Sequence, residues 1–175
     1  MPAHKVKGLD STSSVIAIGF EATESAANTF AQQQIDLNLD PLNREVFVVM
    51  AIDLDPSAPD SVAGTNTTVG TSLTSTTQTA VQNLSNANCL ATGRLEIRAH
   101  AGAVDSGVGF SRQATESPSS LLEYLGIIAT NDFFVQIKGT NNAAAKKVSG
   151  KLYGYRAKAS ADIYAALVQS EVLSA

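Results

Sequence analysis

The stretch Glu45–Pro56, EVFVVMAIDLDP, constrains the fold more than any other part of the sequence. It is nearly continuously apolar, rich in β-branched residues, and closed by a proline. Such a run is typical of a strand covered on both faces, because a half-exposed strand alternates apolar and polar residues. We therefore expect residues 46–54 to form the central strand of a β-rich core.

Period-two alternation, the sequence signature of strands, recurs along the rest of the chain. The further candidate strands cover residues 15–23, 30–40, 68–81, 89–101, 106–115, 132–139 and 146–160. Residues 68–81 lie in a Ser- and Thr-rich segment, residues 57–88, and are expected to form an exposed strand bounded by loops. Long helical patterns do not alternate with these strands. The pattern therefore favours an all-β fold, an antiparallel β-sandwich that is jelly-roll-like and has about eight strands.

Two short helices are expected beside the strands. Ser117, Pro118 and Gly126 supply the start and stop signals of a short internal helix. The sequence SADIYAALVQSEVL indicates a short C-terminal helix with Ser160 as its N-cap. Residues 15–175 are therefore expected to form a single domain. The polar residues 1–14 are expected to form a flexible N-terminal arm that is ordered only against a neighbouring subunit.

Composition limits the chemistry of the chain. It has 175 residues, a net charge of −4, one cysteine and two histidines. These counts exclude an internal disulfide and a Cys/His zinc set, and the charge argues against a surface built wholly for phosphate. The sequence has neither a nucleophile elbow nor a phosphate loop, so we expect no enzymatic activity and no cofactor. No apolar run approaches the roughly 20 residues of a membrane span, so we expect no membrane segment and synthesis in the cytoplasm.

Acidic side chains alternate along two neighbouring segments. Asp36, Asn38 and Asp40 share one face of the first segment, and Asp53 and Asp55 share one face of the second. A hairpin across the intervening PLNR turn would bring these oxygens together as calcium ligands. The alternative is a solvent-facing acidic stripe that discourages edge-to-edge aggregation, and we favour it.

The stretch GKLYGYRAK, residues 150–158, approaches the motif with which RNA-recognition sheets stack bases on aromatic rings. However, Leu152 and Arg156 stand where that motif has glycine and valine, and the pair of crossover helices of that fold is not predicted here. We favour an ordinary sheet strand with Tyr153 and Tyr155 on one face and Leu152 on the other.

Basic residues gather in the same region of a chain that is acidic overall. The candidates for an interface are Lys146, Lys147, Lys151, Arg156 and Lys158. Such a group of charges docks against an acidic neighbour or against nucleic acid. We favour the first partner over nucleic acid, because the chain itself supplies an acidic face in Asp36, Asp40, Asp53 and Asp55.

The C-terminal third, NDFFVQIKGTNNAAAKKVSGKLYGYRAKASADIYAALVQS, combines a strand, a GTNN turn, a YGYRA strand and a closing helix. In this it resembles the end of virion structural proteins of the single jelly-roll kind from marine viruses and phages. The resemblance implies a capsid or capsid-associated subunit and carries over no catalytic residue. It also implies self-assembly, as a trimer or pentamer, with other virion proteins as further partners and the virion as final location.

A second function from a different class is a carbohydrate-binding β-sandwich, of the attachment or adhesin kind. Its sugar site would use Tyr153, Tyr155, Asp53 and Asp55. The chain has no tryptophan, the side chain best suited to stacking on sugars, and this counts against the second function.

Overall fold

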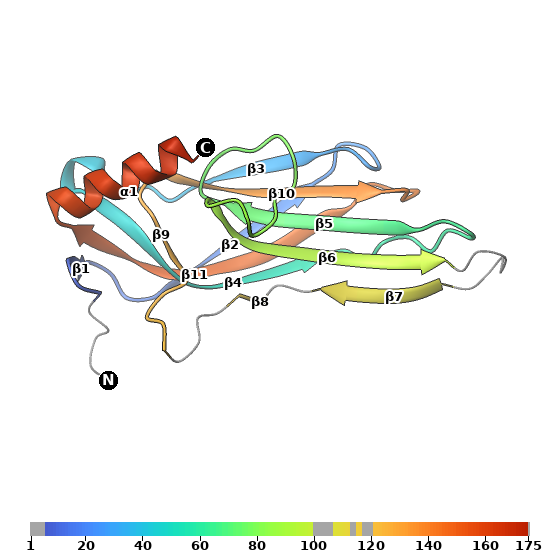
Figure 1. The fold of residues 1–175 in the computed structure, drawn as a ribbon, viewed down its shortest axis with the longest axis horizontal. Coiled ribbons are helices and arrows are strands. Elements are labelled where there is room, and N and C mark those ends of the chain that lie inside the picture. The colour runs from blue at the N-terminus through green and yellow to red at the C-terminus, as the bar shows by residue number, and fades with distance from the viewer. Residues whose placement is uncertain (1–5, 100–106, 113–114, 117–120, 175) are drawn as a thin grey trace.

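The computed structural model describes residues 6–99, 107–112, 115–116 and 121–174. Two antiparallel sheets lie face to face, and the C-terminal helix lies across one end of the molecule (Figure 1). The prediction of an all-β antiparallel sandwich with a short C-terminal helix is therefore confirmed.

The first sheet, sheet A, is organised around the two longest strands. Its members are β1 (Leu9–Ser11), β2 (Ile16–Thr23), β4 (Glu45–Pro56), β8 (Thr115–Glu116), β9 (Gly126–Ile128) and β11 (Lys147–Ala159). Strand β11 pairs with β4 along one edge and with β2 and β1 along the other. The far edge of β4 pairs with the short strands β8 and β9.

The second sheet, sheet B, has the strand order β3-β10-β5-β6-β7. These strands are β3 (Ala31–Asp36), β10 (Asp132–Thr140), β5 (Thr67–Thr74), β6 (Cys89–Ala99) and β7 (Gly107–Arg112). Each sheet thus mixes strands from both ends of the chain. Successive strands cross from sheet to sheet and give the orders β2-β11-β4-β9 and β3-β10-β5-β6. Interlocked Greek keys of this kind are the jelly-roll arrangement.

Strand β4 is the centre of the core, as its composition predicts. Phe47 and Ile52 point between the two sheets, and Val46 and Val48 point to the outer face of sheet A. All four side chains are fully buried. The strand is covered on both faces in this part because helix α1 (Ala161–Leu173) lies on the outer face.

Helix α1 packs Ile163, Tyr164, Leu167 and Val168 onto the outer face of sheet A. Ser160 occupies the N-cap position as predicted, but its side chain makes no capping hydrogen bond. The other end of the helix is fixed by the buried carboxylate of Glu171. It accepts hydrogen bonds from the backbone N–H groups of Ala129 and Thr130, each at 2.9 Å. The helix is therefore held by specific contacts at its far end as well as by apolar packing.

Two glycines of β11 let aromatic rings approach the backbone. A Cβ atom at Gly150 would collide with the ring of Phe20, and one at Gly154 would collide with the ring of Phe47. Neither position accepts a larger residue, since both also crowd the backbone of β4. The absence of a side chain at Gly150 and Gly154 is therefore what allows this close packing.

The predicted internal helix is wrong in its described part. Leu121–Leu125 forms turns and bends, and Gly126 begins strand β9, while residues 117–120 lie outside the described residues. The physical reason is pairing with β4. The N–H of Leu125 donates to the carbonyl of Val49 at 2.8 Å, and β9 continues that contact, so the chain stays extended there.

The Ser- and Thr-rich segment differs from its prediction in exposure. Strand β5 begins one residue before the predicted range 68–81 and covers its first half, but it lies between β10 and β6 and is largely buried. Residues 75–88 fold back over its outer side. The N–H of Gln82 donates to the hydroxyl of Ser72, which itself donates to Gln136, a fully buried side chain. Hydrogen bonds of this kind help to hold the segment over the sheet.

Part of the predicted N-terminal arm lies on the chain itself. Strand β1 pairs with Ala157–Ala159 of β11, and Leu9 is 5% exposed. The N–H of Thr12 also donates to the carbonyl of Arg156 at 2.8 Å. The division into arm and domain, and the mobility of residues 1–14 in a free subunit, stay predictions.

Candidate interface residues

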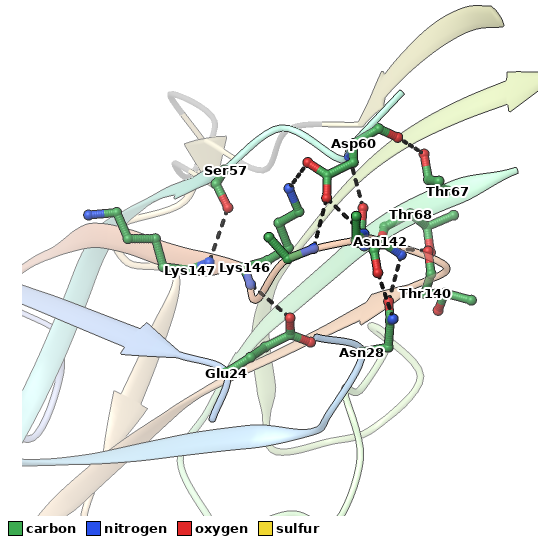
Figure 2. Close-up of polar contacts among 12 residues, drawn as sticks. Glu24, Asn28, Ser57, Asp60, Thr67, Thr68, Thr140, Asn142, Lys146 and Lys147 are labelled. Atoms are coloured by element: carbon green, nitrogen blue, oxygen red, sulfur yellow. Dashed lines mark hydrogen bonds and ion pairs between the residues drawn. The ribbon is translucent and has the colours of Figure 1, made fainter. Parts of the chain in front are cut away.

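Lys146, the first of the predicted interface cations, is enclosed in a polar cluster at the turn between β10 and β11 (Figure 2). Its side chain is 8% exposed, and its ammonium lies 2.5 Å from Oδ1 of Asp60. The other oxygen of Asp60 accepts the N–H groups of Ala143 and Ala144. The hydrogen bond from Lys146, helped by that from Ala144, lowers the pKa of Asp60 below its ordinary value.

Glu24 and Asn142 complete this cluster (Figure 2). The buried carboxylate of Glu24 accepts the N–H of Gly139 at 2.6 Å and that of Lys146 at 2.8 Å. Asn142 donates to the carbonyl of Thr68 and accepts the N–H of Asp60. The cluster ties the end of sheet A to the GTNN turn of sheet B. Because its groups are used inside the chain, we assign it a structural role, and sequence reasoning missed it because its members are far apart in the chain.

The other four cations lie on two different faces of β11. Lys147 and Lys151 point to the outer face of sheet A, where both are exposed. Arg156 and Lys158 have the opposite parity along the strand and point to the side of Leu152. Arg156 donates to the carbonyl of Leu37 at 2.8 Å. The structure therefore brings only Lys147 and Lys151 together on one open surface.

The calcium candidates are divided between the two sheets. Strand β3, with Asp36, pairs with β10 in sheet B, whereas β4, with Asp53 and Asp55, pairs with β11 in sheet A. The expected hairpin does not form because Leu37 and Leu39 are buried where the chain crosses from one sheet to the other. This corrects the hairpin expectation.

Local contacts account for the two acids before β4. Asp36 accepts the side-chain amide of Asn131 at 2.7 Å. Asp40 caps the 3-10 helix η1 (Pro41–Asn43), and its hydrogen bond from the Asn43 side chain lowers its pKa. Among the described residues, no group of three or more Asp, Glu, His or Cys side chains is placed to hold a metal ion.

The two tyrosines share one face of β11, opposite Leu152, as predicted. Tyr155 is 8% exposed beneath helix α1, and its burial, with a smaller contribution from Glu123, raises its pKa. Tyr153 is half-buried beyond the end of that cover. A sugar ring therefore has no access to Tyr155, which removes one of the two aromatic platforms of the carbohydrate-binding hypothesis.

In the described part of the chain, the outer face of sheet A is open beyond helix α1, and we call this surface the open face. It consists of outward residues of β2, β11 and β4, namely Ala17, Gly19, Glu21, Lys147, Ser149, Lys151, Tyr153, Ala51, Asp53 and Asp55. Lys147 makes an exposed ion pair with Glu21 at 3.2 Å. In the described part of the chain, no ion pair joins Lys151 to Asp53, although the two are direct neighbours across β11 and β4.

A groove of about 360 Å³ lies beside helix α1. It is lined by Leu39, Pro41, Ala129, Thr130, Asn131, Tyr164 and Val168. None of these side chains is charged, so the groove offers little chemistry for catalysis.

The helices of the described residues include none that is long and apolar enough to cross a bilayer.

No family model and no curated protein matches the sequence. Among solved structures, a chain described as Desmodium yellow mottle tymovirus is similar over 84% of this chain and 87% of its own length. The two sequences are 12% identical, and the TM-score is 0.30. A similarity at this level supports no conclusion about function. The jelly-roll assignment therefore depends on the strand pairing of this chain alone.

Proposed function

We propose that this protein is a self-assembling coat subunit of a virion, either in the shell or as a decoration on it. The jelly-roll order is compatible with this role, since coat proteins share it with lectin domains. Because one fold serves many functions, the proposal needs support from a surface. The observation that carries it is the apolar edge of sheet B at strand β7.

Strand β7 is the outermost strand of sheet B and pairs, among the described residues, with β6 alone. Val108 and Phe110 lie on the same face of it and are 62% and 55% exposed. The guanidinium of Arg98 lies 5.8 Å from the centre of the Phe110 ring and covers it in part. Edge strands in monomers are usually protected by charge, proline or a covering element. An open edge with two large apolar side chains fits contact with another subunit.

Light scattering after size-exclusion chromatography, over a range of protein concentrations, tests the proposal. We expect a mass that rises with concentration and, by electron microscopy, defined oligomers or particles. Phe110→Lys should weaken association, so that the mass begins to rise only at a higher protein concentration. Leu42→Lys is the matched control, because Leu42 is also exposed but lies on the isolated turn η1. A strict monomer at all concentrations would overturn the proposed function.

A further inference from the structure

We infer that the open face of sheet A is a two-fold contact, with a second copy of this chain as its occupant. The inference extends the proposed self-assembly and rests on it. It differs from the β7 edge in being a face-to-face contact held by charge. Its basis is the cross-strand register of β11 and β4.

The register arranges the open face in rows. Tyr153 is opposite Ala51, Lys151 is opposite Asp53, and Ser149 is opposite Asp55. In each row the β11 residue and the β4 residue are complementary: large and small, cation and anion, hydroxyl and carboxylate. Gly19 and Ala17 flank the first two rows on β2 and have little or no side chain. The surface is therefore recessed on β2, next to the large side chains of Tyr153 and Lys151.

A two-fold axis that runs along the strands, between β11 and β4, exchanges the two columns. Under that rotation, Lys151 lies over the partner's Asp53 and Tyr153 lies over the partner's Ala51. The same rotation places Ser149 over the partner's Asp55. Every complementary row is thereby used twice, as an isologous contact requires. Packed sheets lie about 10 Å apart, a gap that facing lysine and aspartate side chains together roughly span.

The charges of the central row are available for such a contact. Lys151 and Asp53 are both exposed, and within the described chain neither has an ion-pair partner. The three strands contribute about six residues each and present a face on the order of 300 Å² per copy. Stable complexes bury about 800 Å² per partner, so the contact is weak by itself. It suits an assembly in which a second surface, such as the β7 edge, supplies further contacts.

Charge reversal in the central row tests the contact by sedimentation velocity on the full chain. Lys151→Glu places two pairs of like charges across the axis, and so does Asp53→Lys. Each variant alone should dimerise roughly 10-fold or more weakly than the wild type. An equimolar mixture of the two should recover association, because the glutamate introduced in one variant would face the lysine introduced in the other. The double variant should recover it as well.

Asp10→Lys is the matched control, since Asp10 is exposed on β1 and lies away from the open face. Thermal melts check that each variant is folded. If the single variants associate like the wild type, or if their mixture fails to recover, the two-fold contact is wrong even though the wild type assembles. If the wild type is a monomer throughout, the proposed function itself is wrong. Recovery in the mixture cannot come from a change within one chain, so it identifies facing charges.

Discussion

The two halves of the outer face of sheet A are built on the same two strands, but one half is buried and the other is exposed. In the covered half, Val46, Val48 and Tyr155 are buried beneath helix α1. In the open face, Asp53 and Lys151 point outward with nothing over them in the described chain. The two strands stay paired through both halves, with one register shift between them, and the chemistry of the outward side chains differs on its two sides. The same strand can thus be buried in the core at one end and exposed at the other.

A β-bulge marks the boundary between the halves. The pairing of β11 with β4 shifts between Tyr153 and Gly154, where Met50 is the extra residue of β4. Bulges bend a strand and increase its twist. On the near side of the bulge the outward residues of β4 are Val46 and Val48, and on the far side they are Ala51 and two aspartates. The change of composition and the change of geometry therefore coincide.

The largest expected difference comes from truncating the two tyrosines on either side of this boundary. Tyr155→Ala should lower the free energy of unfolding by about 3 to 5 kcal/mol, through lost burial and a cavity under the helix. Tyr153→Ala, the same change two residues away, should cost roughly 1 kcal/mol or less. Urea unfolding of both variants measures the difference. Equal losses would show that the two halves are not distinct.

The next prediction concerns β1, which extends the covered half. Leu9 belongs to the same apolar cluster as Val46 and Tyr155. Leu9→Ala should therefore cost about 2 kcal/mol in the free subunit, at the low end for a buried leucine because β1 is short. Ser11→Ala is the control on the same strand. If Leu9→Ala leaves the melting temperature unchanged, residues 1–14 behave as the mobile arm that the sequence suggests.

A smaller effect is expected for Asp60, the acid that is paired with the buried Lys146. Asp60 is paired with Lys146, and its pKa is lowered, so its contribution to stability is present above about pH 3.9 and is lost as pH falls through the lowered pKa. The stability gap between wild type and Asp60→Asn should therefore be largest near neutral pH and shrink in acid. Asp55→Asn, on the open face, is the control for the loss of a carboxylate as such. Denaturant melts between about pH 2 and 7, a range that brackets the ordinary pKa of a carboxyl group, measure the stability of each variant.

The smallest expected effect is on nucleic acid. Of the five predicted interface cations, only Lys147 and Lys151 share an open surface, and acidic side chains lie beside them. Random single-stranded oligonucleotide should therefore bind no better to the wild type than to Lys147→Glu with Lys151→Glu. Fluorescence anisotropy across a salt series measures this. Tight binding whose log K falls by about 0.7 per phosphate per unit of log salt would contradict it.

Sequence reasoning predicts well wherever one local pattern decides the structure. The run in β4 implies burial on both faces, and alternation places Tyr153 and Tyr155 opposite Leu152. The same alternation rule was enough to separate Lys151 from Arg156, because an odd spacing along a strand places two residues on opposite faces. Treating the cations as one patch overlooked that spacing.

Long-range contacts account for what the sequence did not predict. Leu37 and Leu39 alternate like strand residues, but they are buried by a crossing between sheets that no local pattern reveals. Strand β5 is buried by a loop whose hydrogen bonds reach from Gln82 to Ser72 and on to Gln136. Likewise, nothing near Lys146 in the sequence indicates its pairing with Asp60.

The two glycines of β11 have a consequence for how this sequence can drift over evolutionary time. Gly150 and Gly154 each lie under an aromatic ring and against the backbone of β4, so neither position accepts even one methyl group. The residues between and around them face solvent or a repackable core, and can change with compensation. Divergent descendants of this chain should therefore keep a glycine, three variable residues and a second glycine in their last strand, long after overall identity has become undetectable.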